Sequence, residues 1–92
     1  MNIITVCGMG MGSSLVLKMS VDDILTSHNI NANVEACDLG SLDGRNADLV
    51  ITTDGLRSQV EPKGYKTIYV HNVIDKSFIE KELLDALKKW PL

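Results

Sequence analysis

Short apolar runs alternate with helical patterns along the chain, and this alternation predicts the fold class. Between the first two runs, apolar residues at offsets of four, seven and eight from Leu17 form one stripe and predict a helix over about residues 13–28. Four segments rich in β-branched and aliphatic residues are predicted as strands, near residues 2–6, 33–37, 48–52 and 67–70. Strands that alternate with helices indicate an α/β protein with a parallel sheet.

The second half of the chain predicts shorter helical elements and one long helix. Ser77 and Glu80 have the spacing of a capping box, and a helix is expected from Ser77 until Pro91 stops it. One face of this helix is apolar and consists of Ile79, Leu83, Ala86, Leu87 and Trp90. Residues 55–60 predict a brief helix, residues 63–64 a turn, and residues 40–47 one irregular turn, because that segment is short for a crossover helix.

The expected architecture is a single three-layer domain over residues 1–92, with helices flanking a four-stranded parallel sheet. Right-handed crossovers with the first strand inside the sheet give the strand order 2-1-3-4. The chain has 92 residues and is 45% hydrophobic, which suits one compact core. The loop after the first strand then lies at the carboxyl edge of the sheet, near the point where the strand order reverses, which is where such folds bind ligands.

Charge and cysteine content exclude several classes of function. Nine Lys and Arg residues against twelve Asp and Glu give a net charge of -3, and no basic cluster exceeds Lys88-Lys89, so no nucleic-acid partner is expected. The sequence shows no secretion signal and no long apolar span, which favours a cytoplasmic protein. Cys7 and Cys37 do not have the spacing of a redox pair or a zinc site, so both are expected as reduced thiols, with no metal and no cofactor.

The segment that follows the first strand carries the candidate chemistry. Glycines let successive main-chain N–H groups turn inward, and the positive end of the following helix dipole points to the same volume. Serines at the helix start can cap the helix and donate hydroxyl hydrogen bonds. Because a cysteine opens the segment, the bound anion is expected to be its thiolate or a phosphoryl group on its sulfur. The catalytic residue is therefore predicted as Cys7, and the phosphate-binding loop as Gly8, Met9, Gly10, Met11, Gly12, Ser13 and Ser14.

Three other interpretations of this segment remain open. The glycines could form only a tight turn, with Cys7 as a small buried hydrophobe. A cysteine phosphatase would carry an arginine where the spacing of five residues after Cys7 places Ser13, and the absence of that phosphate clamp favours relay of the phosphoryl group over its hydrolysis. Gly8-x-Gly10-x-Gly12 with Asp38 resembles part of a dinucleotide site, but the third glycine has the wrong spacing.

The segment from Cys7 to Leu15, with Lys18-Met19 after it, resembles the phosphorylation loop of a known protein family. That family is the B component of enzyme II in the bacterial phosphoenolpyruvate-dependent sugar phosphotransferase system. The resemblance covers nearly the whole chain and is to the lactose/cellobiose type of B component. The loop is most similar to that of the L-ascorbate branch, and galactitol is an alternative substrate.

The resemblance implies a phosphotransferase that works as a two-step relay. A phosphohistidine on the A component would give its phosphoryl group to Cys7, and Cys7 would pass it to the sugar bound in the membrane-embedded C component. The amides of residues 8–14 would hold the phosphoryl oxygens. The protein would then be cytoplasmic and associate transiently with the inner face of the membrane through the C component.

Several residues near the loop have two interpretations each. Met9 and Met11 could form a docking surface for partners or pack against the sheet, whereas Leu15 is assigned to the core. Asp54, just past the third strand, could be a general acid but is more typical of a turn or cap. Cys37 lies on the strand beside Cys7, so its thiol could come near Cys7 under oxidation, but core packing is favoured because cytosolic disulfides are rare.

The two histidines are assigned to the surface. His28 falls at a helix end, where the helix dipole favours a cation. His71 follows the fourth strand, two strand spacings from Cys7, which is too far for direct phosphoryl exchange.

Overall fold

The computed structural model describes residues 1–8 and 12–89. Its four strands are β1 (Asn2–Cys7), β2 (Asn33–Asp38), β3 (Leu49–Thr53) and β4 (Thr67–Val70). The two long helices are α1 (Gly12–Ser27) and α4 (Lys76–Lys88). The short helical elements are α2 (Leu39–Leu42), η1 (Asp54–Leu56), α3 (Arg57–Val60) and η2 (Glu61–Lys63).

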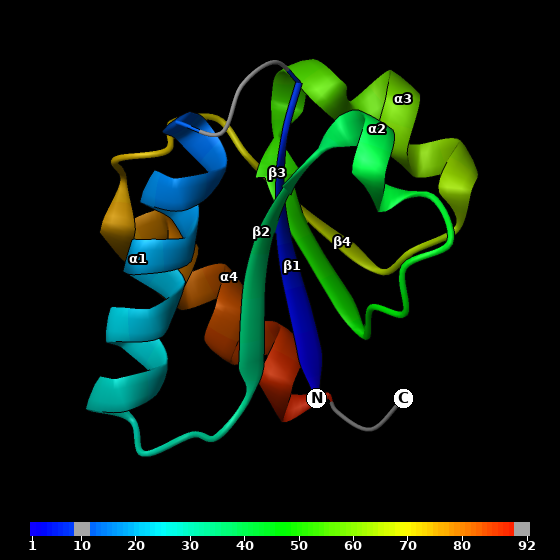
Figure 1. Ribbon diagram of the computed structural model, residues 1–92. Helices are drawn as coiled ribbons and strands as arrows, with labels where there is room; N and C mark the ends of the chain where they lie inside the picture. Colours follow the sequence, from blue (N-terminus) through cyan, green and yellow to red (C-terminus); the bar gives the residue numbers. More distant parts are fainter. Residues whose placement is uncertain (9–11, 90–92) are drawn as a thin grey trace.

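The strands form one parallel sheet in the order β2-β1-β3-β4, so the predicted topology is confirmed. Helices α1 and α4 lie on one side of the sheet and α2 and α3 on the other, which gives the predicted three layers (Figure 1). None of the helices among the described residues is long and apolar enough to cross a membrane.

Each face of the sheet has its own hydrophobic core, because successive side chains on a strand point to opposite faces. The predicted stripe of α1 is confirmed, since Leu17, Val21, Ile24 and Leu25 are all buried against the sheet and α4. The same core contains Ile3, Leu49, Ile51, Ile68, Val70, Ile79 and Leu83. The core on the opposite face is smaller and consists of Ile4, Val6, Cys37, Leu42, Val50 and Val60.

The pairing of β1 with its two neighbours ends at different heights, and this difference shapes the site. β1 pairs with β2 as far as Cys7, whose partner in register is Asp38. Its pairing with β3 ends two residues earlier, at Thr5 and Ile51. Beyond Thr5, the ladder pairing of β1 is therefore with β2 alone.

Two local predictions were wrong. The start of α4 is capped by Asp75, whose carboxylate accepts the N–H of Phe78 at 3.1 Å, and the predicted capping box at Ser77 lies inside the helix. The segment after β2 contains the one-turn helix α2, capped by Asp38, where only an irregular turn was expected. The turn at Gly64 is confirmed, with a φ of 84° that a glycine adopts without strain. Trp90 and Pro91, assigned to the end of the last helix, lie outside the described residues.

Candidate active site at the carboxyl end of β1

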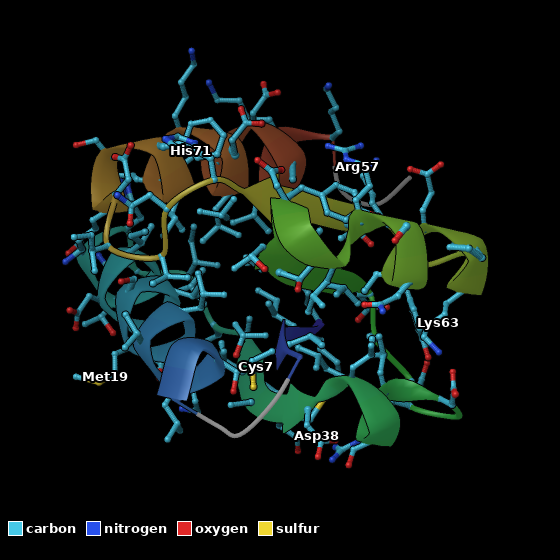
Figure 2. All side chains as sticks on the ribbon, turned by 90° about the horizontal axis from the view of Figure 1, so that it is seen from above. Cys7, Met19, Asp38, Arg57, Lys63 and His71 are labelled. Carbon is cyan, nitrogen blue, oxygen red and sulfur yellow. The ribbon has the colours of Figure 1, made fainter. Side chains whose placement is uncertain are left out.

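Cys7 is the last residue of β1 and lies at the carboxyl edge of the sheet, between the start of α1 and the end of β2, where Asp38 is found (Figure 2). Cys7 is only 3% exposed, and its sulfur lies 4.0 Å from the carbonyl oxygen of Cys37. Burial is expected both for a cysteine that only packs as a small hydrophobe and for a catalytic cysteine in a closed loop, so burial alone does not distinguish these two interpretations. The position at a strand end that leads into a helix is the part that favours chemistry.

The loop begins with a glycine that has a close neighbour. A Cβ atom on Gly8 would lie 3.2 Å from the Cδ2 atom of Leu56, which follows β3. The side chain of Leu56 therefore packs where a larger residue at position 8 would need space. Met9, Gly10 and Met11 lie outside the described residues, and the predicted ring of inward amides stays a prediction.

The far end of the loop leads directly into α1. The helix begins at Gly12, one residue before the predicted start, and runs for 16 residues. Its positive dipole end and its first main-chain N–H groups are therefore placed beside the end of β1. Of the two serines predicted to assist, Ser14 is fully buried.

Polar side chains buried in the described part of the molecule gather around this loop. They are Thr5, Ser14 and Thr52, each with 0% exposure. The Thr5 hydroxyl donates to the Ser14 carbonyl oxygen at 2.8 Å, and the Thr52 hydroxyl donates to the Val6 carbonyl oxygen at 3.0 Å. Neither threonine was predicted from the sequence as part of the site, although each interrupts a run of aliphatic residues in its strand.

The carboxylates near the site are committed to local structure. Asp38 caps α2 by accepting the Ser41 N–H at 2.8 Å, and hydrogen bonding with the side chain and then the main chain of Ser41 holds the pKa of the carboxyl below its ordinary value. Asp54 opens η1, and its carboxylate lies 3.9 Å from the guanidinium of Arg57, which stacks over the Tyr69 ring at 4.0 Å. Arg57 lies well away from Cys7 in Figure 2. These contacts agree with the interpretation of Asp54 as a turn residue.

Cys37 packs in the smaller core, as predicted, and burial raises the pKa of its thiol. The predicted surface positions of both histidines are also confirmed. His28 pairs with Glu80 at 3.2 Å, and His71 pairs with Asp75 at 3.4 Å on the far side of β3 from Cys7. No cluster of potential metal ligands is present among the described residues.

The assignment of Leu15 to the core was wrong. Leu15 is 47% exposed, and Val16 and Met19 on the same first two turns of α1 are 38% and 67% exposed. Met19 projects from the outer side of α1 in Figure 2. We call these three residues the α1 apolar patch. Leu15 also lines a groove with Lys18, Ala36 and Arg45, beside the edge strand β2.

Comparison with known proteins identifies the family. Residues 2–86 match the family described as the PTS system, lactose/cellobiose-specific IIB subunit, and the chain belongs to this family. It is thus a phosphotransferase and a component of a phosphoryl relay for sugar import.

Relatives with assigned names are similar over almost their whole length. The ascorbate-specific PTS system EIIB component of Salmonella choleraesuis is 32% identical over 90 residues, which cover 95% of this chain and 89% of the relative. The protein with the same name in Escherichia coli O157:H7 gives the same values.

Solved structures support the fold. The lactose-specific IIB component domain from Streptococcus pneumoniae superimposes with a TM-score of 0.66 at 12% identity and covers 98% of this chain and 97% of its own. A YwlE mutant from Bacillus subtilis gives a TM-score of 0.62 at 16% identity, covering 96% and 99%.

Proposed function

We propose that Cys7 is the residue that carries the phosphoryl group. Its sulfur would attack the phosphorus of a phosphohistidine on the A component, so that the S–P bond forms as the N–P bond breaks and the imidazole nitrogen keeps the electron pair. In the second step a sugar hydroxyl attacks the same phosphorus, the S–P bond breaks, and the thiolate is restored while the hydroxyl proton leaves to a base or water. The observation that supports this role is the place of Cys7 at the end of β1, next to the start of α1.

The phosphoryl oxygens would be held by the main chain of residues 8–14. Gly8 directly follows Cys7, and α1 begins at Gly12, so main-chain N–H groups at the positive end of the helix dipole would face the phosphoryl oxygens. Hydrogen bonds from such groups are strong when the acceptor is charged. With no arginine in the loop, the phosphocysteine would be held without the clamp that speeds its hydrolysis.

L-ascorbate is the proposed substrate of the whole relay. The support is the name of relatives that are 32% identical over 95% of the chain, together with the form of the loop. Galactitol is the second candidate, on the resemblance of the loop alone. The sugar would bind to the C component and meet the phosphocysteine there.

The proposed partners are two proteins, the phosphoryl donor A component and the membrane-embedded C component. The α1 apolar patch supports this, because three exposed apolar residues on the turns beside Cys7 suit contact with another protein. We place the protein in the cytoplasm, at the inner face of the membrane while it is bound to the C component.

Intact mass after phosphorylation tests the role of Cys7. The protein is incubated with phosphoenolpyruvate, the two general phosphotransferase proteins and the A component of the same system. We expect the mass of one added phosphoryl group in the wild type and in the Cys37→Ser control, and no addition in Cys7→Ser. Phosphorylation of Cys7→Ser to the wild-type level would overturn the proposal.

Two further measurements separate the alternatives. Rapid turnover of p-nitrophenyl phosphate by the isolated protein would favour a phosphatase over a relay. Transfer from the phosphorylated protein to labelled L-ascorbate and to labelled galactitol, in vesicles that contain the C component, identifies the substrate. We expect phosphorylated ascorbate as the product, and transfer to galactitol alone would reject ascorbate.

A further inference from the structure

Two buried threonine hydroxyls hold the main chain just before Cys7 and at the last residue of the predicted phosphate-binding loop. Val6, whose carbonyl accepts from Thr52, precedes Cys7, and Ser14, whose carbonyl accepts from Thr5, lies in the first turn of α1. We propose that Thr5 and Thr52 are positioning residues that set the direction of the Cys7 sulfur for in-line transfer. This inference rests on the proposed function of Cys7 and adds the groups that orient it.

Thr52 acts where the sheet no longer holds β1 on one side. The ladder between β1 and β3 ends at Thr5 and Ile51, so Val6 lies beyond the last pair. The Thr52 hydroxyl takes over at that point with a 3.0 Å bond to the Val6 carbonyl. This carbonyl belongs to the planar peptide group that joins Val6 to Cys7, so fixing it fixes the plane from which the Cys7 side chain projects.

Thr5 connects the strand to the helix. Its hydroxyl donates to the Ser14 carbonyl at 2.8 Å, and its oxygen also lies 3.4 Å from the Glu35 carbonyl of β2. The bond therefore fixes the first turn of α1 relative to β1. The anchored carbonyls of Val6 and Ser14 therefore fix the end of β1 and the start of α1, so that Cys7 and the first turn of the helix keep one relative placement.

The choice of threonine at these positions points to the site rather than to the core. Valine has the same shape, suits a buried strand, and brings no polar group that must be satisfied. The neighbouring buried positions of the same strands are indeed aliphatic, as at Ile3, Ile4 and Ile51. Each hydroxyl contributes little net stability, because it exchanges a hydrogen bond to water for one to protein. A geometric role explains why these hydroxyls are placed at the loop.

The test compares Thr→Val substitutions at the two proposed positioning residues with the same substitution at a threonine far from Cys7. Thr52→Val and Thr5→Val remove the donors, and Thr52→Ser and Thr5→Ser restore them. Thr67→Val is the matched control, because the Thr67 hydroxyl also donates to a main-chain carbonyl, that of Tyr65 at 3.0 Å, but at the start of β4. Phosphorylation of Cys7 by the phosphorylated A component is followed at several donor concentrations, and thermal unfolding is followed in parallel.

We expect the maximal rate to fall on the order of tenfold in Thr52→Val and Thr5→Val, as for a misoriented nucleophile. The donor concentration at half-maximal rate should not change. The serine variants should recover most of the rate, and Thr67→Val should keep the wild-type rate at a similar loss of thermal stability. A maximal rate in both valine variants equal to that of Thr67→Val would overturn the proposal.

A second readout does not depend on phosphoryl transfer. The rate at which iodoacetamide alkylates Cys7 is measured against pH by peptide mass, and we expect a changed pH profile in Thr52→Val that Thr52→Ser restores. If the A component fails to phosphorylate wild-type Cys7, the proposed function fails while this measurement still tests the positioning. An unchanged alkylation profile in both valine variants contradicts the positioning role alone.

Discussion

Cys7 and Cys37 lie on adjacent strands but are one residue out of register, since Cys37 pairs with Val6 and Cys7 pairs with Asp38. Alternation along a strand therefore directs the two side chains to opposite faces of the sheet. The Cys37 side chain packs with Ile4 and Val6 in the smaller core. Neither cysteine forms a disulfide in the structure, although the two strands are direct neighbours.

This arrangement predicts that the two cysteines do not form a disulfide. Mild oxidation should leave no intramolecular bond, because a disulfide needs Cβ vectors that point toward each other. Because burial raises the pKa of Cys37, this thiol should stay protonated and unreactive at neutral pH. Peptide mass after brief alkylation should show label on Cys7 before Cys37. Preferential labelling of Cys37 would contradict both the geometry and the proposed role of Cys7.

Met19→Asp should weaken docking of the phosphoryl donor. The change places a charge in the α1 apolar patch, and we expect the donor concentration at half-maximal rate to rise on the order of fivefold. The maximal rate should stay near that of the wild type, because Met19 is 67% exposed on the outer side of α1.

Thr26→Asp is the control for Met19→Asp. Thr26 is exposed on the same helix, roughly 10 Å further along its axis, and lies outside the α1 apolar patch. The same charge placed there should leave the kinetics unchanged. If both variants behave like the wild type, the donor does not bind this patch. An effect confined to transfer from Cys7 to the sugar would assign the patch to the C component.

Gly8→Ala should disturb the start of the loop through Leu56. The new Cβ would lie 3.2 Å from the Leu56 Cδ2 atom, so that side chain must shift by a few tenths of an ångström. We expect a loss of about 1 kcal/mol in the free energy of unfolding, as for mild overpacking. Denaturant unfolding of both single variants and of Gly8→Ala with Leu56→Ala measures this, and the cost of the alanine should shrink when Leu56 is truncated. An equal cost in both backgrounds would show that Leu56 is not the obstacle.

Asp38→Ala should remove a pH-dependent contribution to stability. In the folded protein, hydrogen bonding with the side chain and the main chain of Ser41 lowers the pKa of Asp38 from its ordinary value of 3.8. A lowered folded pKa means that the stabilisation is fully present above pH 3.8 and is lost as the pH falls through the lower folded value. The difference in melting temperature between wild type and Asp38→Ala should therefore be constant near neutral pH and decrease below about pH 4. A difference that grows on acidification would reverse the sign and reject the argument.

The sequence by itself determined the elements, their order and the place of the candidate site. Leu17, Val21, Ile24 and Leu25 repeat with the helical period, so their burial follows from local geometry. The strand order follows from the handedness of crossovers, and the site follows from a cysteine that ends a strand before a glycine-rich segment. The exposure of Leu15 could also have been predicted from the sequence. Leu15 and Leu17 are two positions apart, which separates them by about 200° around the helix axis, and Leu17 faces the sheet.

Only the tertiary structure decided which polar groups meet. Asp75 and Ser77 are both residue types that favour the N-cap of a helix. The path of the chain after β4 makes Asp75 the one that accepts the Phe78 N–H. The partners of Thr5 and Thr52 lie 9 and 46 residues away in sequence, so no local sequence pattern predicts these hydrogen bonds. Periodicity reports which side of an element faces the core, whereas a hydrogen bond across the sheet depends on the register and the height at which each strand ends.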